Sequence, residues 1–369
     1  MILINTQRMK QFTKVVLVNL AILAVGLLAL ELIFGSWIKQ SNKLNQLNII
    51  RSANHQFETG QLYKSEKPVI SYTRDKYGFR TSSPGQPQRF TIVTIGGSTT
   101  EQRFISDEDT WQQVLERAYR TAGKQVIIAN AGVDGQSTFG HIKNFEWWFP
   151  QVPGLHPKYY LFYVGINDLH VDAGNPYDSL QGPSTPIKGL KAAIANNSAI
   201  YAMIRRLRGW KQAKQVRKVD HAPTNWDTVR YTTTPRAGNY GELMQNRCRQ
   251  YQQRIAQLIA FTKQQGATPI FVTQPTLMYR VVGDTLYGSA NTFDYDGQPA
   301  NGVDYYYLKR QLDSTLQHTC NQQQIPYIPM ANEGIFGQAD FYDLYHMTPA
   351  GTHKFGKLLF SKLHPITKF

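Results

Sequence analysis

The stretch Phe90-Thr-Ile-Val-Thr-Ile-Gly-Gly-Ser-Thr99 decides the fold. It begins with six apolar or β-branched residues in a row, and two glycines and a serine follow directly. A short continuous run of this kind indicates a strand that is buried on both faces, as in a parallel sheet covered by helices. The two glycines allow the chain to turn sharply where the strand ends.

Comparable runs recur along the chain and alternate with segments of helical periodicity. Strands are predicted at 91–95, 126–130, 159–164, 268–273 and 326–329. Helices are predicted at 110–122, 137–149, 243–265, 303–323 and 349–363. Alternation of strands and helices predicts an α/β fold with parallel strands and right-handed crossovers.

Short polar motifs follow three of these strands, and a fourth lies near the end of the chain. They are Gly96-Gly-Ser98-Thr99, Asn130-Ala-Gly-Val-Asp-Gly135, Gly165-Ile-Asn167-Asp168 and Asp343-Leu-Tyr-His346. In an open parallel sheet, sites form at the carboxyl ends of the strands. The motifs supply a serine, two further hydrogen-bond donors for an oxyanion and an acid–base pair, which acyl transfer through a serine requires.

Each motif also has a purely structural interpretation. Ser98-Thr-Thr-Glu101 is a capping box, which starts a helix without any catalytic role. A lone Asp343–His346 pair fits a protein surface equally well, Gly135 fits a turn, and Asn167 can bond to its own loop. The glycine-rich turn lacks the lysine of a P-loop and the spacing of a dinucleotide fingerprint. The absence of a Gly-x-Ser-x-Gly elbow argues against the α/β-hydrolase fold.

Taken together, the four motifs closely resemble the four sequence blocks of the SGNH (GDSL-like) hydrolase family, over about residues 90–363. The resemblance implies a three-layer α/β/α sandwich with a five-stranded parallel, flavodoxin-like sheet. It implies Ser98 as nucleophile, His346 as general base and acid, and Asp343 as the residue that orients His346. Ser98 and Gly135 would supply backbone N–H groups to the oxyanion hole, and Asn167 a side-chain N–H. The family motif has Asp before the serine, whereas this chain has Gly97, a departure that bears on the subfamily.

The N-terminus is predicted to be a membrane anchor. Val15 to Phe34 is a twenty-residue run interrupted only by Asn19 and Glu31, long enough to span a bilayer as a helix. Arg8, Lys10 and Lys14 precede it, which favours a cytoplasmic start. No Ala-x-Ala cleavage site follows the run.

The predicted organisation follows from that anchor. It comprises a cytoplasmic segment (1–14), a transmembrane signal anchor (15–35), a stalk (36–88) and the hydrolase-like domain (89–369) with an insertion at 172–240. We expect a single-pass protein whose catalytic domain faces the periplasm or the exterior.

A net charge of +15 favours an acidic partner such as anionic lipid or acidic polysaccharide. No nucleic-acid-binding motif occurs in the sequence, so nucleic acid is not a predicted partner.

Residues 179–219 contain nine Lys or Arg and no acid, and Ile200, Met203, Ile204, Leu207 and Trp210 recur at helical spacing. This segment is either a basic helix that binds an anionic membrane or acidic chain, or a lid packed on the domain. Residues 277–309 are rich in aromatics, which stack on sugars or simply pack in turns.

The cysteine and histidine content predicts neither a metal nor a cofactor. Cys248 and Cys320 fall on different predicted helices and form either one disulfide or two separate buried thiols. The nine histidines show no metal-ligand spacing.

With the anchor, the resemblance implies a serine esterase of the cell envelope that removes O-acetyl or other short acyl groups from a polysaccharide or glycan. Three alternatives remain open: an O-acyltransferase of a surface polysaccharide, a lipid esterase, and a non-catalytic glycan-binding module.

Overall fold

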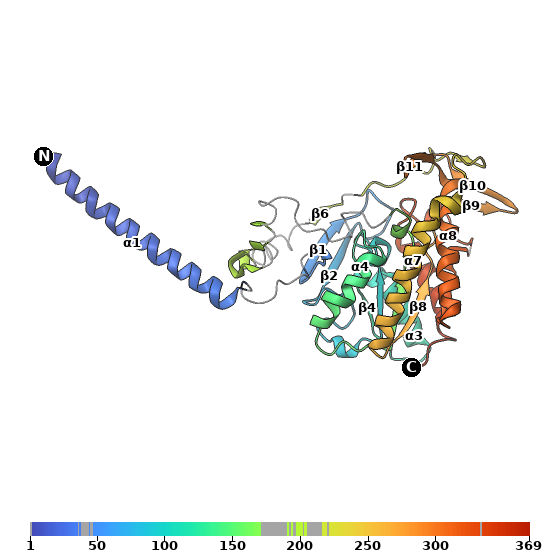
Figure 1. Cartoon of the computed structure of the whole chain (residues 1–369), viewed down its shortest axis with the longest axis horizontal. Coiled ribbons are helices and arrows are strands. Elements are labelled where there is room, and N and C mark those ends of the chain that lie inside the picture. Colours follow the sequence, from blue (N-terminus) through green and yellow to red (C-terminus); the bar gives the residue numbers. More distant parts are fainter. Residues whose placement is uncertain are drawn as a thin grey trace. The chain divides into compact units, whose positions relative to one another are not determined.

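The computed structural model describes residues 2–35, 37, 44, 47–170, 216–219, 221–332 and 334–369, and parts of 190–204. The chain forms two compact units, one of residues 1–45 with 181–212 and one of residues 46–180 with 213–369 (Figure 1). Among the described residues of the first unit, helix α1 (Ile2–Phe34) contains a 26-residue stretch, Met9–Phe34, whose most apolar 18-residue window has a mean hydropathy of 2.6 and no buried part. This helix is long and apolar enough to cross a membrane.

The second unit is built on a five-stranded sheet, which confirms the predicted fold class. Its order is β13-β8-β5-β3-β4, and all neighbouring strands are parallel. The strands are β3 (Ile92–Gly96), β4 (Ile128–Asn130), β5 (Tyr159–Tyr163), β8 (Thr268–Val272) and β13 (Tyr327–Ile328). All residues of β3 and β5 are buried, as expected for strands covered on both faces.

Two layers of helices cover this sheet. On one face α3 (Trp111–Thr121) and α9 (Pro349–Leu363) pack together over a core that includes Ile92, Leu161 and Phe355. On the other face α7 (Tyr240–Gln264) packs against α8 (Gly302–Gln322) and α4 (Thr138–Lys143). Alternate residues of each strand therefore serve the two cores, and the carboxyl ends of the strands remain available for a site.

Local sequence explains where these helices begin. Asn301 and Asp304 form a capping box at the start of α8, and the Thr348 hydroxyl accepts the N–H of Gly351 at the start of α9, whose first residue is Pro349. The helix predicted over 137–149 is shorter than expected. It is α4 followed by a π-helical turn at Asn144–Trp148, in which Phe145 and Trp148 are buried.

The segment predicted to be a stalk, residues 36–88, differs from that expectation between 47 and 88. Strands β1 (Ala53–Glu58) and β2 (Val69–Arg74) pair with each other and, through β1, with β6 (Val216–Lys218) of the insertion. This small sheet covers its own core, which includes Tyr72 and Phe104. The buried guanidinium of Arg74 donates to the carbonyl of Gly132, so the segment is part of the catalytic unit.

Two smaller sheets involve the aromatic segment 277–309, and one of them also includes a strand of the insertion. They are formed by β7 (Tyr231–Thr232), β10 (Thr285–Ser289) and β9 (Tyr279–Val282), and by β11 (Phe293–Tyr295) with β12 (Gln298–Ala300). Tyr295 and Tyr305 are buried, so packing accounts for these two aromatics.

Cys248 and Cys320 are both free, and the Cys320 thiol, whose pKa burial raises to about 12, is inert.

Candidate active site

Ser98 lies where the central strand β3 ends, as the first residue of the short helix α2 (Ser98–Glu101). A side chain at Gly96 would clash with the carbonyl oxygen of Tyr163, and one at Gly97 would clash with the amide of Asn167. The Asn167 amide can therefore lie this close to the turn before Ser98 because position 97 has no side chain.

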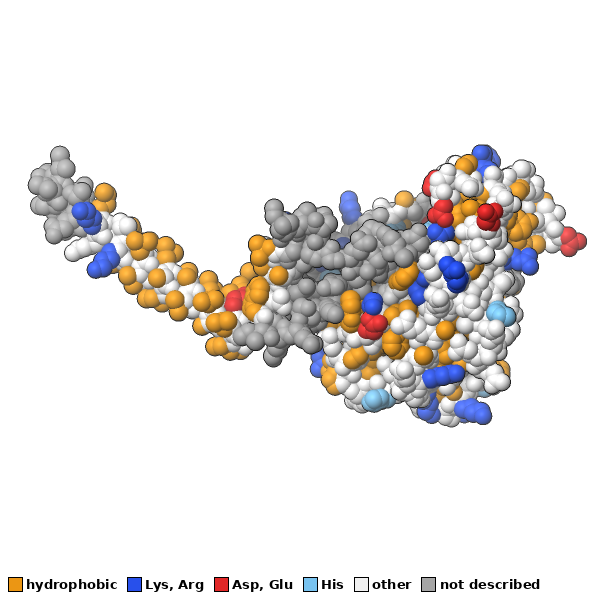
Figure 2. All heavy atoms as spheres, in the orientation of Figure 1, with side chains coloured by type: hydrophobic (Ala, Val, Ile, Leu, Met, Phe, Trp, Pro, Cys, Tyr) orange, Lys and Arg blue, Asp and Glu red, His pale blue; other side chains and the backbone are white. Residues whose placement is uncertain are grey.

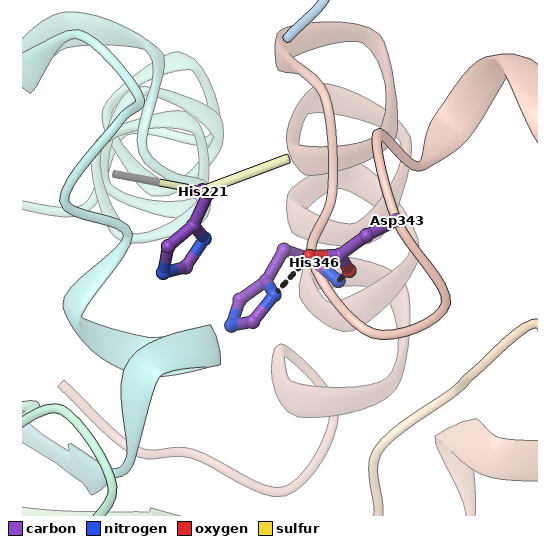
Figure 3. A group of neighbouring side chains, drawn as sticks. All are labelled: His221, Asp343 and His346. Carbon is purple, nitrogen blue, oxygen red and sulfur yellow. Dashed lines mark hydrogen bonds and ion pairs between the residues drawn. The ribbon is translucent and has the colours of Figure 1, made fainter. Parts of the chain in front are cut away.

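His346 connects the serine to a carboxylate. Its Nε2 lies 2.8 Å from Ser98 Oγ, and its Nδ1 lies 2.7 Å from Asp343 Oδ2 (Figure 3). An ionised carboxylate only accepts hydrogen bonds, so Nδ1 carries the proton and Nε2 is left as the acceptor for the serine hydroxyl. The structure thus brings together three residues that are up to 248 positions apart in the sequence.

The Asp343 carboxylate is held by its own loop. Its Oδ1 accepts the backbone N–H groups of Tyr345 at 2.8 Å and His346 at 2.6 Å. Burial on its own would raise the pKa of Asp343, but these two N–H groups and the His346 ring outweigh it, and the pKa lies below its ordinary value. Asp343 is therefore ionised at neutral pH and fixes the tautomer of His346.

Gly135 and Asn167 lie on adjoining loops at the same end of the sheet. Gly135 has a φ of +70°, which favours glycine, in the loop between β4 and α4. The Asn167 side chain donates from Nδ2 to the carbonyl of Gln136 at 2.8 Å. An amide nitrogen carries two hydrogens, so this bond holds Asn167 in place and leaves a second N–H for a ligand.

Gln274 is a site residue that the sequence analysis missed. It follows β8, is buried, accepts the backbone N–H of Ile166 at 2.7 Å and donates to Thr99 Oγ1 at 2.7 Å. It therefore ties the loop of Asn167 to the turn of Ser98. The sequence does carry a signal for it, because Gln274 directly follows a predicted strand, as three of the four polar motifs do.

A buried ion pair links the loops that carry Gly135 and Asn167. Asp168 Oδ1 accepts the N–H of Thr138 at 3.1 Å and the Thr138 hydroxyl at 2.5 Å, and lies 3.5 Å from the guanidinium of Arg254 on α7. Arg254 also donates to the Thr138 hydroxyl and lies over the ring of Phe139. Thr138 begins the helix after Gly135, and Asp168 follows Asn167, so this cluster links the two loops.

His221 lies beside His346 and was also missed, because it comes from the insertion. Its ring centroid lies 5.1 Å from that of His346 and 4.8 Å from that of Phe104, and Nδ1 lies 3.3 Å from the Tyr342 hydroxyl (Figure 3). Backbone contacts fix this loop, because Val219 belongs to the core of the small sheet and Thr224 donates to the carbonyl of Tyr342.

His221, Asp343 and His346 are also the one group of described residues whose ligand atoms, all within 4.8 Å of one another, could hold a metal. Two of the three are the pair already joined to Ser98. That the reaction uses no metal stays a prediction.

A small hollow opens beside the serine. It is lined by Ser98, Thr99, Gln102, Ile105, Tyr163, Tyr342, Tyr345, His346 and Met347, and has a volume of about 10 Å³. A cavity of that size has room for on the order of one water molecule. The group that occupies it has to be small unless the walls move.

Comparison with known proteins assigns the chain to a class. The model of the GDSL-like Lipase/Acylhydrolase family matches residues 94–270, which include Ser98, Gly135 and Asn167. Residues 94–270 therefore form a GDSL-like lipase/acylhydrolase domain, of the family also called SGNH hydrolases, and the protein is a serine esterase. This assignment favours an enzyme over the non-catalytic alternative.

Solved structures of low identity are similar to the chain. TesA is 11% identical with a TM-score of 0.42, over 75% of this chain and 99% of its own. The acetyl xylan esterase AlAXEase is 13% identical with a TM-score of 0.38, over 73% and 98%. A member of the lipolytic protein G-D-S-L family from Veillonella parvula is 14% identical with a TM-score of 0.38, over 73% and 96%. No curated protein matches the chain. Such distant likenesses carry no conclusion about the substrate.

Proposed function

We propose that the protein removes O-acetyl or other short acyl groups from a polysaccharide or glycan at the cell envelope, through a Ser98–His346–Asp343 triad and an acyl-enzyme. The observation that carries the proposal is the continuous link from Ser98 Oγ through His346 to Asp343, at 2.8 and 2.7 Å. Distances of this size are those of a nucleophile within reach of its base and a base held by its orienting partner.

The reaction follows from these positions in two steps. Ser98 Oγ attacks the ester carbonyl carbon while His346 Nε2 takes the hydroxyl proton, and Asp343 stabilises the resulting imidazolium. The tetrahedral oxyanion accepts the N–H groups of Ser98, Gly135 and Asn167. His346 then protonates the leaving alcohol as its bond to carbon breaks. A water molecule, deprotonated by His346, attacks the acyl-enzyme, and Ser98 leaves with the proton as the acid is released.

The small hollow beside Ser98 supports a short acyl group. An acyl chain that enters this hollow displaces more of its lining, such as Ile105, Tyr163 or Met347, the longer the chain is, and forcing extra methylenes into packed surroundings costs about 1–3 kcal/mol. That free energy corresponds to roughly one to two orders of magnitude in rate.

Turnover of p-nitrophenyl esters of increasing chain length tests this part of the proposal. We expect kcat/KM to fall at least about tenfold from acetyl to octanoyl, since each carries the same leaving group and differs only in the acyl chain. An octanoyl ester hydrolysed as fast as the acetyl ester would contradict the short-acyl assignment and favour a lipid esterase.

Replacing Asn167 with Ala removes the side-chain donor from the oxyanion hole. We expect kcat to fall on the order of a hundredfold, because one such donor is worth roughly 3–4 kcal/mol in the transition state. KM for p-nitrophenyl acetate should change little. A variant with normal kcat would show that Asn167 has no part in stabilising the oxyanion, and circular dichroism would confirm that the variant is folded.

The envelope location rests on α1. Its apolar run from Val15 to Phe34 is preceded by Arg8, Lys10 and Lys14, which favours a cytoplasmic N-terminus and supports an esterase on the opposite side of the membrane. The net charge of +15 suits an acidic polysaccharide or an anionic lipid surface near the enzyme.

A further inference from the structure

The carboxylate of Glu31 near the end of α1 is bound by the insertion. It accepts hydrogen bonds from the Ser198 hydroxyl at 2.5 Å and from the backbone N–H groups of Ala199 at 3.0 Å and Ile200 at 3.1 Å. The indole of Trp37 donates to it as well, at 2.8 Å. Glu31 and Ser198 are 167 positions apart and belong to the same compact unit. The acid that interrupts the apolar run is therefore a tether for a distant segment.

The tether explains how an acid is tolerated in an apolar helix. A carboxylate placed in a membrane helix costs several kcal/mol unless it is paired or lies at the interface. Here four donors satisfy it, only three residues before α1 ends at Phe34. The backbones also approach closely, because a Cβ on Gly35 would lie 3.0 Å from the carbonyl oxygen of Asn197. A segment held this tightly lies at the same depth as the end of α1.

The tethered segment exposes apolar side chains. The exposed fractions are 62% for Leu190, 42% for Tyr201, 56% for Met203 and 40% for Ile204, and Ile194 is exposed to a similar degree. Figure 2 shows exposed apolar side chains along α1 as well. Within residues 181–212 the sequence adds six basic residues and no acid: Lys188, Lys191, Arg205, Arg206, Arg208 and Lys211. Leu207 and Trp210 of the predicted basic helix lie outside the described residues.

We propose that the described residues between 190 and 204 lie in the interface of the bilayer that holds α1, on an anionic lipid surface, and that Glu31 fixes them there. Apolar side chains next to basic ones are the composition of segments that lie in the headgroup region. Each Lys or Arg near an anionic surface contributes about 1 kcal/mol. The tether also requires α1 to be retained, because cleavage after α1 would remove the acceptor of Ser198, Ala199 and Ile200.

Fluorescence of a label at position 203 tests this inference in the full chain, reconstituted in vesicles of phosphatidylcholine with phosphatidylglycerol. A nitrobenzoxadiazole label is attached to Met203→Cys in a Cys248→Ser, Cys320→Ala background. The matched control is Val281→Cys, also exposed, on β9 of the catalytic unit. We expect spin-labelled lipid to quench position 203 at least twofold more than position 281, and aqueous iodide to show the opposite preference.

Two further conditions separate the proposal from its rivals. Glu31→Leu, which keeps α1 apolar but removes the acceptor, should abolish the lipid quenching at 203 while p-nitrophenyl acetate turnover and membrane retention are unchanged. In vesicles without phosphatidylglycerol, the lipid quenching at position 203 should be weaker. Protection of position 203 from both quenchers would show that the segment is a lid packed on the protein, and iodide quenching equal to that at 281 would show a segment in water. Either result, or quenching that is insensitive to Glu31→Leu, would overturn the proposal.

Discussion

Ser98→Ala is expected to lower kcat for p-nitrophenyl acetate by roughly 10⁴ to 10⁶-fold, because it removes the atom that forms the acyl-enzyme. The fold should be unaffected, since Ala is a good helix residue and the Ser98 side chain does not cap α2. Steady-state turnover of the full chain in detergent measures the loss.

The matched control for this variant is Ser361→Ala, an exposed serine on α9 whose hydroxyl bonds only to its own helix. It should keep normal kcat. Turnover by Ser98→Ala within tenfold of the unmodified protein would mean that another group carries the reaction.

Asp343→Asn is expected to lower kcat by about 10⁴-fold at neutral pH without unfolding the loop. The Asn oxygen can still accept the N–H groups of Tyr345 and His346, which now bind Asp343 Oδ1. Its amide nitrogen, however, donates to His346 Nδ1 and forces the proton of the ring onto Nε2. Nε2 then faces Ser98 as a donor and cannot take the serine proton.

Steady-state turnover again measures this effect, with Asp284→Asn as the matched control because Asp284 is exposed in the turn between β9 and β10. Asp284→Asn should keep normal kcat. If Asp343→Asn lost less than tenfold, His346 would be oriented by another group, and Asp343 would serve only its own loop.

The five strands could be predicted from sequence because each is a continuous apolar run. The site could be predicted because three of its four motifs directly follow strands. The Asp343–His346 pair was recognisable because both residues lie on one loop, three positions apart. Gly97 was noted as a departure from the family motif, and only the structure shows that the Asn167 amide occupies the space of a side chain at that position.

What could not be predicted depends on contacts between distant segments. Strand β1 contains polar residues on both sides of His55, so its sequence resembles a linker, and it is stable as a strand because β2 and the remote β6 pair with it. His221 and Arg254 reach the site from the insertion and from α7, far from any motif. Glu31 read as an isolated acid in an apolar run, because its partners lie 167 to 169 positions away.

The most direct test of the triad is covalent labelling of the full chain with a fluorophosphonate, followed by peptide mass spectrometry. The account predicts one adduct, on Ser98, that is absent from Ser98→Ala and strongly slowed in Asp343→Asn. A folded, unmodified protein that takes no label, or one labelled at a different residue, would contradict the assignment of Ser98 as the nucleophile.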